Sequence, residues 1–240
     1  MFNHSLETGA PISEPSDSGE KITRGEATRE LILDTAIRLF RKNGFDETTM
    51  RGVAGEAGVA LGLAYHYFPS KEAVVMAYYE RVQQQHRIVV HDQLAQTRSL
   101  RDRLVMLMQT NLDILKDDRK LLGALFRYTG NPEHPLSFLG KATAPLRKDC
   151  MGLFAEALEP ERLPDDLREL LPRALWALHM GVLLYFLYDP SPNLRRTRRL
   201  SEGSLDLTVS FLKLAKLPVL RPARRGVMAL LRDAGLLPAN

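Results

Sequence analysis

The sequence has little cysteine, few aromatic residues and no long apolar run. Its single cysteine, Cys150, cannot form an intrachain disulfide, which agrees with a reducing cytoplasm. No uninterrupted apolar run reaches the roughly 18 residues of a membrane span; the longest near-continuous one, residues 174–188, is interrupted by His179. The first seven residues lack the basic start and the apolar core of a secretory signal. We therefore expect a cytoplasmic protein that does not enter a membrane.

The residue patterns of common catalytic and metal sites are also missing. His86 and His91 are five residues apart and would point in different directions from a helix. The other histidines have no cysteine or carboxylate set at metal-ligand spacing. Neither a nucleophile elbow nor a phosphate-binding glycine loop is present. The sequence therefore predicts no enzymatic activity, no cofactor and no metal.

What the chain does have is helical periodicity. Apolar residues recur at three- and four-residue steps, and proline and glycine separate the periodic segments. Helices are predicted near residues 27–43, 49–56, 60–67, 71–96, 100–116, 118–129, 139–158, 165–188, 197–216 and 222–233. No strand pattern competes, and 45% hydrophobic content is ample for a packed core. The predicted fold class is all-α.

Composition and charge divide the chain. Residues 1–24, rich in Ser, Glu, Pro and Gly, are predicted to be a disordered leader. Residues 25–85 are predicted to form a helix-turn-helix domain and residues 86–218 a larger helical ligand-binding and dimerisation domain. Residues 219–240 form a basic C-terminal arm with a short helix. Residues 28–85 carry no net charge, whereas residues 190–240 carry +7, for which a solvated helix face is the simplest explanation.

The segment from Gly44 to Pro69 has the features of a helix-turn-helix. A helix with one apolar face ends at Gly44, and Thr48 or Thr49 can cap a short helix that follows. Gly58 supplies a turn, and the next short helix ends at Pro69. Three helices in this order can present the third one to a DNA major groove.

This part of the chain resembles the TetR family of bacterial transcriptional regulators. The resemblance covers about a quarter of the sequence and rests on Ile32, Ala36, Leu39-Phe40, Gly44-Phe45, Thr48-Thr49, Val53-Ala54, Ala57-Gly58-Val59, Gly62, Tyr65, Phe68 and Ser70-Lys71-Glu72. It implies a homodimer that binds a double-stranded DNA operator.

The resemblance also implies which residues meet DNA. They are Thr48, Thr49, Arg51, Ala60, Leu61, Gly62, Leu63, Tyr65, His66, Tyr67 and Lys71. Tyr65 resembles the family tyrosine at the DNA backbone and Lys71 the family lysine at a phosphate. A merely solvated Lys71 and a merely exposed Arg51 are the alternatives. Leu61 and Leu63 depart from the polar residues that many members carry, so they can read only thymine methyls or shape, unless one packs inward.

The C-terminal part contains a helix, residues 174–188, that is apolar nearly all round and must be covered on both sides. By resemblance, it pairs with its symmetry mate and with the helix near residues 201–216, while its opposite face borders a ligand cavity. Candidate cavity residues are Asn111, Leu112, Leu115, Leu122, Phe126, Met151, Phe154, Trp176, His179 and Tyr185. Each can also be ordinary core, and for His179 a satisfied interior or interface histidine is favoured.

These features favour a ligand-responsive DNA-binding regulator, with repression favoured over activation. The effector is expected to be a largely apolar small molecule that releases the dimer from a palindromic operator. A DNA-binding architectural protein without an effector, or an all-helical enzyme or carrier, are the alternatives.

Overall fold

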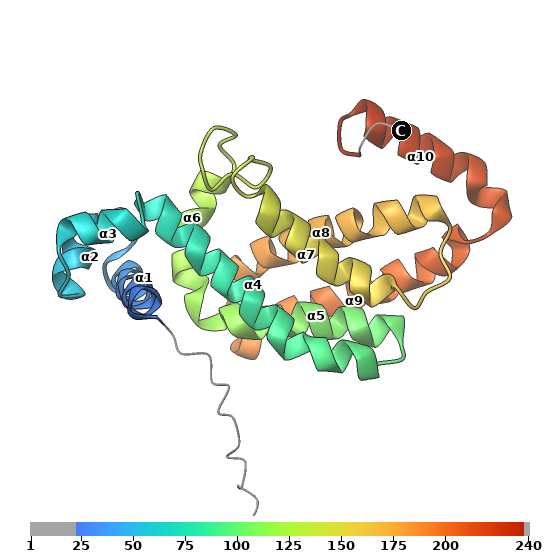
Figure 1. Cartoon of the computed structure of the whole chain (residues 1–240). Coiled ribbons are helices and arrows are strands. Elements are labelled where there is room, and N and C mark those ends of the chain that lie inside the picture. The colour runs from blue at the N-terminus through green and yellow to red at the C-terminus, as the bar shows by residue number, and fades with distance from the viewer. Residues whose placement is uncertain (1–22, 238–240) are drawn as a thin grey trace, which may run out of the picture.

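The computed structural model describes residues 23–237, and all regular secondary structure in this part of the chain is helical (Figure 1). The elements are α1 (Arg24–Asn43), α2 (Met50–Glu56), α3 (Leu61–Tyr67), α4 (Lys71–Gln96), α5 (Leu100–Leu115), η1 (Lys116–Asp118), α6 (Arg119–Thr129), α7 (Ala144–Leu158), α8 (Asp165–Tyr188), η2 (Pro192–Leu194), α9 (Arg195–Ala215), η3 (Pro218–Leu220) and α10 (Arg221–Asp233). The predicted all-α fold is confirmed. Each predicted helix occurs, and two of the predicted starts need correction.

The first helix begins earlier than predicted, at Arg24. Thr23 and Glu26 form a capping box: the Thr23 hydroxyl accepts from the Glu26 amide at 3.2 Å, and the Glu26 carboxylate accepts from the Thr23 amide at 2.7 Å. This pair fixes the helix start three residues before the predicted residue 27. Residues 1–22 of the predicted leader lie outside the described residues.

The seventh helix begins later than predicted, at Ala144 and not at residue 139. The Thr143 hydroxyl donates to the Ser137 carbonyl at 2.5 Å and holds the preceding segment in a turn. Pro145 lies in the first turn of α7, where its missing N–H costs no helical hydrogen bond. The turn and the proline together move the start of the helix to Ala144.

Side-chain caps and a glycine turn delimit the short helices α2 and α3 and the start of α4. The Thr49 hydroxyl accepts from the Gly52 amide at 3.1 Å and caps α2, and the Ser70 hydroxyl caps α4 in the same way. Between α2 and α3, Gly58 has φ +67°, which a residue with a Cβ adopts only at a cost. The sequence thus forces a sharp turn before α3.

A hydrophobic core joins α1, α2, α3 and the start of α4. Ile32, Ala36 and Val53 are fully buried in it, and Phe40 and Phe45 pack edge to face at 5.1 Å. Side chains from α6 and the segment after it complete the same core; they are Leu121, Leu125 and Leu136. The N-terminal domain is therefore attached to the rest of the molecule through shared apolar packing.

The larger helical domain is a bundle in which α7 packs on α8 and α5 packs on both α4 and α9 (Figure 1). Its main core contains Leu104, Met108 and Phe154. Arg103 is buried inside it, and its guanidinium is satisfied by the Ala157 carbonyl at 2.7 Å and by Glu161 at 3.0 Å. A second, smaller cluster around Phe186 fills the end nearer to α6.

By length and composition, α8 is apolar enough to cross a membrane, with a mean hydropathy of 1.5 over its most apolar window. This helix was not identified from the sequence as a candidate span, because only uninterrupted apolar runs were considered. The helix packs against α5, α6, α7, α9 and α10 within the folded domain, with Leu175, Val182 and Phe186 buried. Only 22% of that window is buried, so contacts within one copy of the chain cover only part of the apolar surface of α8.

The basic C-terminal arm is docked on the start of α8 and is not only a solvated face. Arg224 of α10 pairs with Asp166 at 2.8 Å, and Arg232 pairs with Glu169 at 2.9 Å. The other arginines of α10 are exposed. The simplest explanation of the charge pattern therefore holds for only part of this arm.

Candidate functional site

The outward face of α3 is formed by four exposed residues. They are Gly62, Leu63, Tyr65 and His66, with Tyr65 48% exposed and Leu63 39% exposed. Ala64 is fully buried, and Leu61 packs on the N-terminal core. Of the two leucines that depart from the family pattern, Leu61 therefore faces inward and Leu63 faces out.

The predicted DNA-contacting residues around α2 also divide into buried and exposed ones. Thr48 is buried, and its hydroxyl donates to the Gly44 carbonyl at 2.8 Å, so it supports the turn from inside. Thr49 is the helix cap and is exposed, as are Arg51 and Ala60. The exposed residues form one side of the N-terminal domain together with α3.

Lys71 and Tyr67 are partly engaged within the protein. The Lys71 ammonium donates to the carbonyls of Phe45 at 2.7 Å and Asp46 at 3.1 Å, and lies 4.6 Å from the centre of the Phe45 ring. Tyr67 is half-buried and packs on the N-terminal core. Both side chains help to orient α3 and α4 whatever else they contact.

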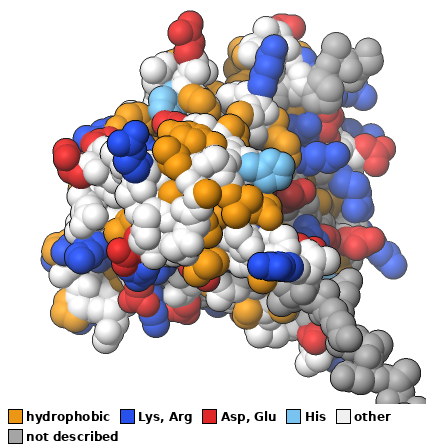
Figure 2. All heavy atoms as spheres, turned by 60° about the vertical axis from the view of Figure 1, so that its left-hand side comes forward, with side chains coloured by type: hydrophobic (Ala, Val, Ile, Leu, Met, Phe, Trp, Pro, Cys, Tyr) orange, Lys and Arg blue, Asp and Glu red, His pale blue; other side chains and the backbone are white. Residues whose placement is uncertain are grey.

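Charges of both signs are interspersed with hydrophobic side chains on the side of the molecule that holds α2 and α3 (Figure 2). No continuous basic area appears in this view, in agreement with the zero net charge of residues 28–85. Affinity for phosphates would therefore depend on the placement of a few groups and on pairing of two copies.

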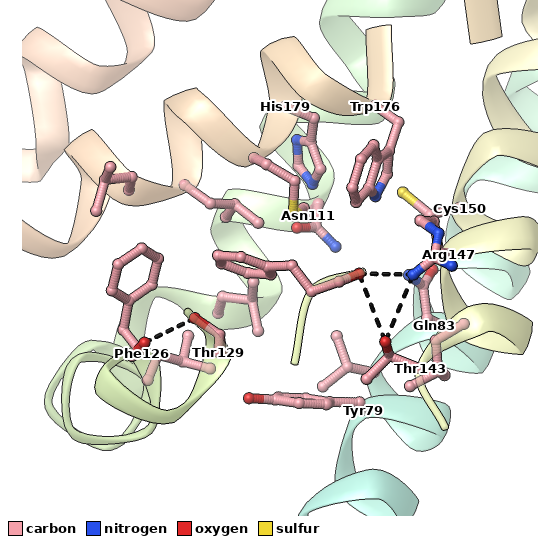
Figure 3. Close-up of a pocket in the computed structure, with 18 of the residues that line it drawn as sticks. Tyr79, Gln83, Asn111, Phe126, Thr129, Thr143, Arg147, Cys150, Trp176 and His179 are labelled. Carbon is pink, nitrogen blue, oxygen red and sulfur yellow. Dashed lines mark hydrogen bonds between the residues drawn. The ribbon is translucent and has the colours of Figure 1, made fainter. Parts of the chain in front are cut away.

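A cavity of about 190 Å³ lies among α4, α5, α6, α7 and α8 (Figure 3). Of the residues predicted for it, six line its wall: Asn111, Leu115, Leu122, Phe126, Trp176 and His179. One face of α8 contributes a row of apolar side chains, namely Trp176, Met180, Leu183 and Leu187. Most of the lining is apolar, as is usual for a small-molecule pocket.

Four predicted cavity residues lie elsewhere. Leu112 is fully buried in the small core cluster beside Phe186, and Phe154 is buried in the main core. Met151 does not line the cavity, although its neighbour Cys150 does. Tyr185 is 38% exposed on the outer side of α8. The periodicity identified these residues as apolar helix faces, but it could not say which face meets the cavity.

Besides Asn111 and His179, which the sequence predicted, the cavity wall has further polar residues that sequence reasoning missed. They are Gln83, Thr143 and Arg147, together with Tyr79. Arg147 donates to the Phe138 carbonyl at 2.6 Å, and within the described residues it forms no ion pair with a carboxylate (Figure 3). The positions of Tyr79, Gln83 and His86 at three- and four-residue steps could have shown a common face of α4.

The two interior histidines are neutral at physiological pH. Burial lowers the pKa of His179 to about 3 and that of His86 to about 4, because a charged ring would lose its hydration. Burial likewise raises the pKa of the Cys150 thiol to about 11, so the thiol is uncharged. Among the described residues, no group of histidine, cysteine and acidic side chains could hold a metal ion.

A polar link joins α1 to the junction between α5 and α6. The Arg41 guanidinium donates to both oxygens of the buried Asp118 carboxylate, at 2.5 and 2.9 Å, and the Tyr78 hydroxyl donates at 2.6 Å. Burial acts to raise the pKa of Asp118, but the bonds from Arg41 and Tyr78 outweigh it and hold that pKa below its usual value. The carboxylate is therefore charged, and it ties the N-terminal domain to the helices around the cavity.

Comparisons with known proteins agree with this arrangement. Residues 32–78 match bacterial regulatory proteins of the tetR family, and residues 103–227 match the tetracyclin repressor-like C-terminal domain. A 49-residue segment is 45% identical to the uncharacterized HTH-type transcriptional regulator YerO of Bacillus subtilis, and covers 20% of this chain and 17% of that protein. The chain spans only 17–28% of the length of the first curated relatives that it matches.

Solved structures share the fold over most of the chain. A putative TetR-family regulator from Syntrophomonas wolfei superposes with a TM-score of 0.62 at 14% identity, covering 76% of this chain and 95% of that one. FadR of Thermus thermophilus, a TetR-family repressor solved with lauroyl-CoA, gives 0.58 at 29% identity, covering 74% and 92%. Since the two family matches cover both domains and the second alone spans more than half of the residues, the chain belongs to the TetR family of bacterial regulatory proteins.

Proposed function

We propose that the protein is a dimeric transcriptional repressor of the cytoplasm that binds a palindromic operator and is released by a small molecule. The observation that carries this proposal is the position of α6. Leu121 and Leu125 on one side of α6 belong to the core of the N-terminal domain, while Leu122 and Phe126 line the cavity. A molecule in the cavity therefore touches an element on which the DNA-binding helices are packed.

The exposed face of α3 would enter the major groove of DNA. Tyr65 carries a hydroxyl for the DNA backbone, and Gly62 allows close approach of the helix. Leu63 is apolar and can contact thymine methyl groups, so this face would read shape and methyl positions more than hydrogen-bonding edges.

Phosphate contacts would come from the exposed side chains that flank α3. Arg51 is exposed in the first turn of α2, and the Thr49 hydroxyl can donate while it caps the helix. Lys71 would reach a phosphate only by loosening its bonds to the carbonyls of Phe45 and Asp46. In this proposal Thr48 and Leu61 act by supporting the surface from inside.

The dimer would form through the outer faces of α8 and α9. Large apolar side chains are exposed there at helical spacing: Tyr185 and Tyr188 on α8, and Leu200, Leu207, Phe211 and Leu214 on α9. So many large exposed apolar side chains on two helices are unusual on a monomer, and isologous pairing would bury them. The pairing would also fix the spacing of the two α3 helices.

The effector would carry an aliphatic chain. The cavity is largely apolar, and the 29% identical Thermus thermophilus structure is described in complex with lauroyl-CoA. Arg147 on the cavity wall could pair with an anionic end of such a molecule. The presence of this cavity favours an effector-responsive protein over a DNA-binding architectural protein that has no effector.

Release from DNA would require the effector to bind one domain arrangement more tightly than the other. The link between Arg41, Asp118 and Tyr78 supports this proposal, because it ties α1 to the junction between α5 and α6. Asp46 strengthens this connection, because it pairs with Arg127 and accepts from the Tyr128 hydroxyl, both on α6. A shift of α6 would thus change the position of α3.

The experiment is selection of duplexes from a random DNA pool by the purified protein, followed by measurement of affinity with and without lauroyl-CoA. A palindromic site with half-sites about one helical turn apart is expected, with weaker binding when lauroyl-CoA is present. Lys71→Met should weaken binding, while the matched change Lys148→Met on the exposed side of α7 should not. If the wild-type protein selects no specific DNA sequence from the pool, the proposed function is overturned.

A further inference from the structure

Four buried polar atoms beside the cavity have no protein hydrogen-bond partner among the described residues. They are Oε1 of Gln83, Nδ1 of His86, Oδ1 of Asn111 and Nδ1 of His179. Gln83, Asn111 and His179 line the cavity, and they come from three different helices, α4, α5 and α8 (Figure 3). We call these four residues the acceptor cluster.

The types of the unpartnered atoms, and the bond that His86 makes through its other nitrogen, decide the chemistry of the cluster. His86 Nε2 faces the Leu107 carbonyl at 2.9 Å, so Nε2 carries the ring proton and Nδ1 offers a lone pair. The unpartnered atom of Gln83 is its amide oxygen, Oε1, which can only accept a hydrogen bond. Oδ1 of Asn111 is likewise an amide oxygen, and Nδ1 of His179 accepts when the ring proton is on Nε2. The cluster therefore offers at least three acceptors and calls for a donor.

An unpaired buried polar atom is costly, and a native fold has few of them. Their concentration beside one cavity therefore needs an explanation. The cavity, at about 190 Å³, is much larger than the roughly 15 Å³ needed to enclose one water molecule, so it can admit part of a ligand. His179 is 4% exposed and Asn111 is 5% exposed, so bulk solvent does not reach them easily.

The donor should be uncharged. Within residues 23–237, no aspartate or glutamate lines the cavity, and Arg147 already places one cation on its wall. A buried ammonium group would therefore find no opposite charge and would lose its hydration. A hydroxyl can donate to an amide or imidazole acceptor without either cost, and its oxygen can still accept in return.

We propose that the effector is a hydroxylated aliphatic acid or its thioester, with the hydroxyl bound by the acceptor cluster and the acidic or thioester end facing Arg147. This inference rests on the proposed function, because it names the ligand class of the same cavity. It adds a basis for selectivity: a plain aliphatic chain would fill the apolar part and leave the cluster unpaired. A site built to hydrogen-bond a hydroxyl discriminates strongly against an analogue that lacks it.

The test compares dodecanoic acid with its derivatives hydroxylated near the carboxylate, at mid-chain or at the far end. Binding is measured by calorimetry, and release of DNA is measured in parallel. At least one hydroxylated isomer should bind about tenfold more tightly than dodecanoic acid. The Asn111→Leu variant should lose most of this preference while it still binds dodecanoic acid, and its thermal midpoint should not fall, since an unpaired buried group is removed.

Leu122→Met, an apolar change in the same cavity wall, is the matched control and should keep the preference. Gln83→Leu is a second cluster variant in case Asn111→Leu does not fold. Equal affinity for all the acids would overturn the inference, and so would a hydroxyl preference that survives in both cluster variants. Neither result would contradict the proposed function. Absence of binding by every acid would also overturn it, whereas loss of specific DNA binding by the wild-type protein would instead refute the proposed function.

Discussion

Replacement of Asp118 by asparagine tests whether the link between the two domains stabilises the fold and transmits the effector signal. The carboxylate accepts two hydrogen bonds from Arg41 and one from Tyr78, and it is 5% exposed. Asparagine has nearly the same shape, but it has no charge and only one acceptor oxygen. Asp118→Asn therefore removes the ion pair with little change in packing.

The magnitude follows from the exposure of the partners. Removal of one member of a fully buried ion pair costs about 3–5 kcal/mol, chiefly because the other charge is left without hydration. Here the Arg41 side chain is 51% exposed and can be hydrated after the change, which lowers the cost. The remaining loss is that of charge-assisted hydrogen bonds, and we expect about 2 kcal/mol in the free energy of unfolding. In a chain of this length that corresponds to a fall of roughly 4–8 °C in the thermal midpoint.

Urea unfolding followed by circular dichroism measures this loss. Asp117→Asn is the matched control, because Asp117 is the neighbouring residue and is exposed. Operator affinity of the folded Asp118→Asn variant should stay close to that of the wild type, while the fraction of DNA released by a saturating effector should fall. A free energy of unfolding within about 0.5 kcal/mol of the Asp117→Asn control would refute the stabilising role. Unchanged release by the effector would refute the coupling role.

Four further predictions follow from other parts of the molecule. Phe211→Glu, at a side chain that is 65% exposed on α9, should give monomers in analytical ultracentrifugation; a stable dimer would place the interface elsewhere. Tyr65→Ala should weaken operator binding about tenfold at an unchanged thermal midpoint, since the side chain is half exposed; full affinity in a gel-shift titration would remove Tyr65 from the contact surface. The folded-state pKa of His179 lies below its ordinary value of 6.5, so stability should be lost as the pH falls from about 6.5 to about 3. His179→Phe should flatten this loss in urea titrations, and an unchanged pH profile would contradict the argument. Gly58→Ala should cost about 1 kcal/mol because φ is +67°, whereas the helical control Gly55→Ala should cost nothing; equal costs would show that the turn is not strained by a side chain.

The sequence predicted the helices well because their ends depend on local chemistry. Thr49 and Ser70 cap their own helices, and Gly58 forms the turn, so each signal can be read within a few residues. The start of α7 was wrong because it depends on the Thr143 hydroxyl, which folds back on the Ser137 carbonyl. Such a bond has no distinctive pattern in the sequence.

The cavity was predicted only in part for a similar reason. Helical periodicity shows that Trp176 lies on an apolar face, and the structure places that face at the cavity. It cannot show that Arg147 on another helix points at the same space, or that Asp118 meets Arg41 across 77 residues of chain. His179 was expected to be satisfied in the interior; it is interior, but its Nδ1 has no protein partner among the described residues. These relations arise from packing between helices, which one sequence does not specify residue by residue.

The shared packing of the N-terminal core has a consequence for protein engineering. A fragment that ends after residue 85 would lack Leu121, Leu125 and Leu136, which close the core under Phe40 and Phe45. Such a fragment would expose part of that core to water and would lose the ion pairs made by Asp46 and Arg41. DNA-binding domains can be exchanged between relatives to combine a new operator with a given ligand. The exchanged part should then include a compatible α6 surface.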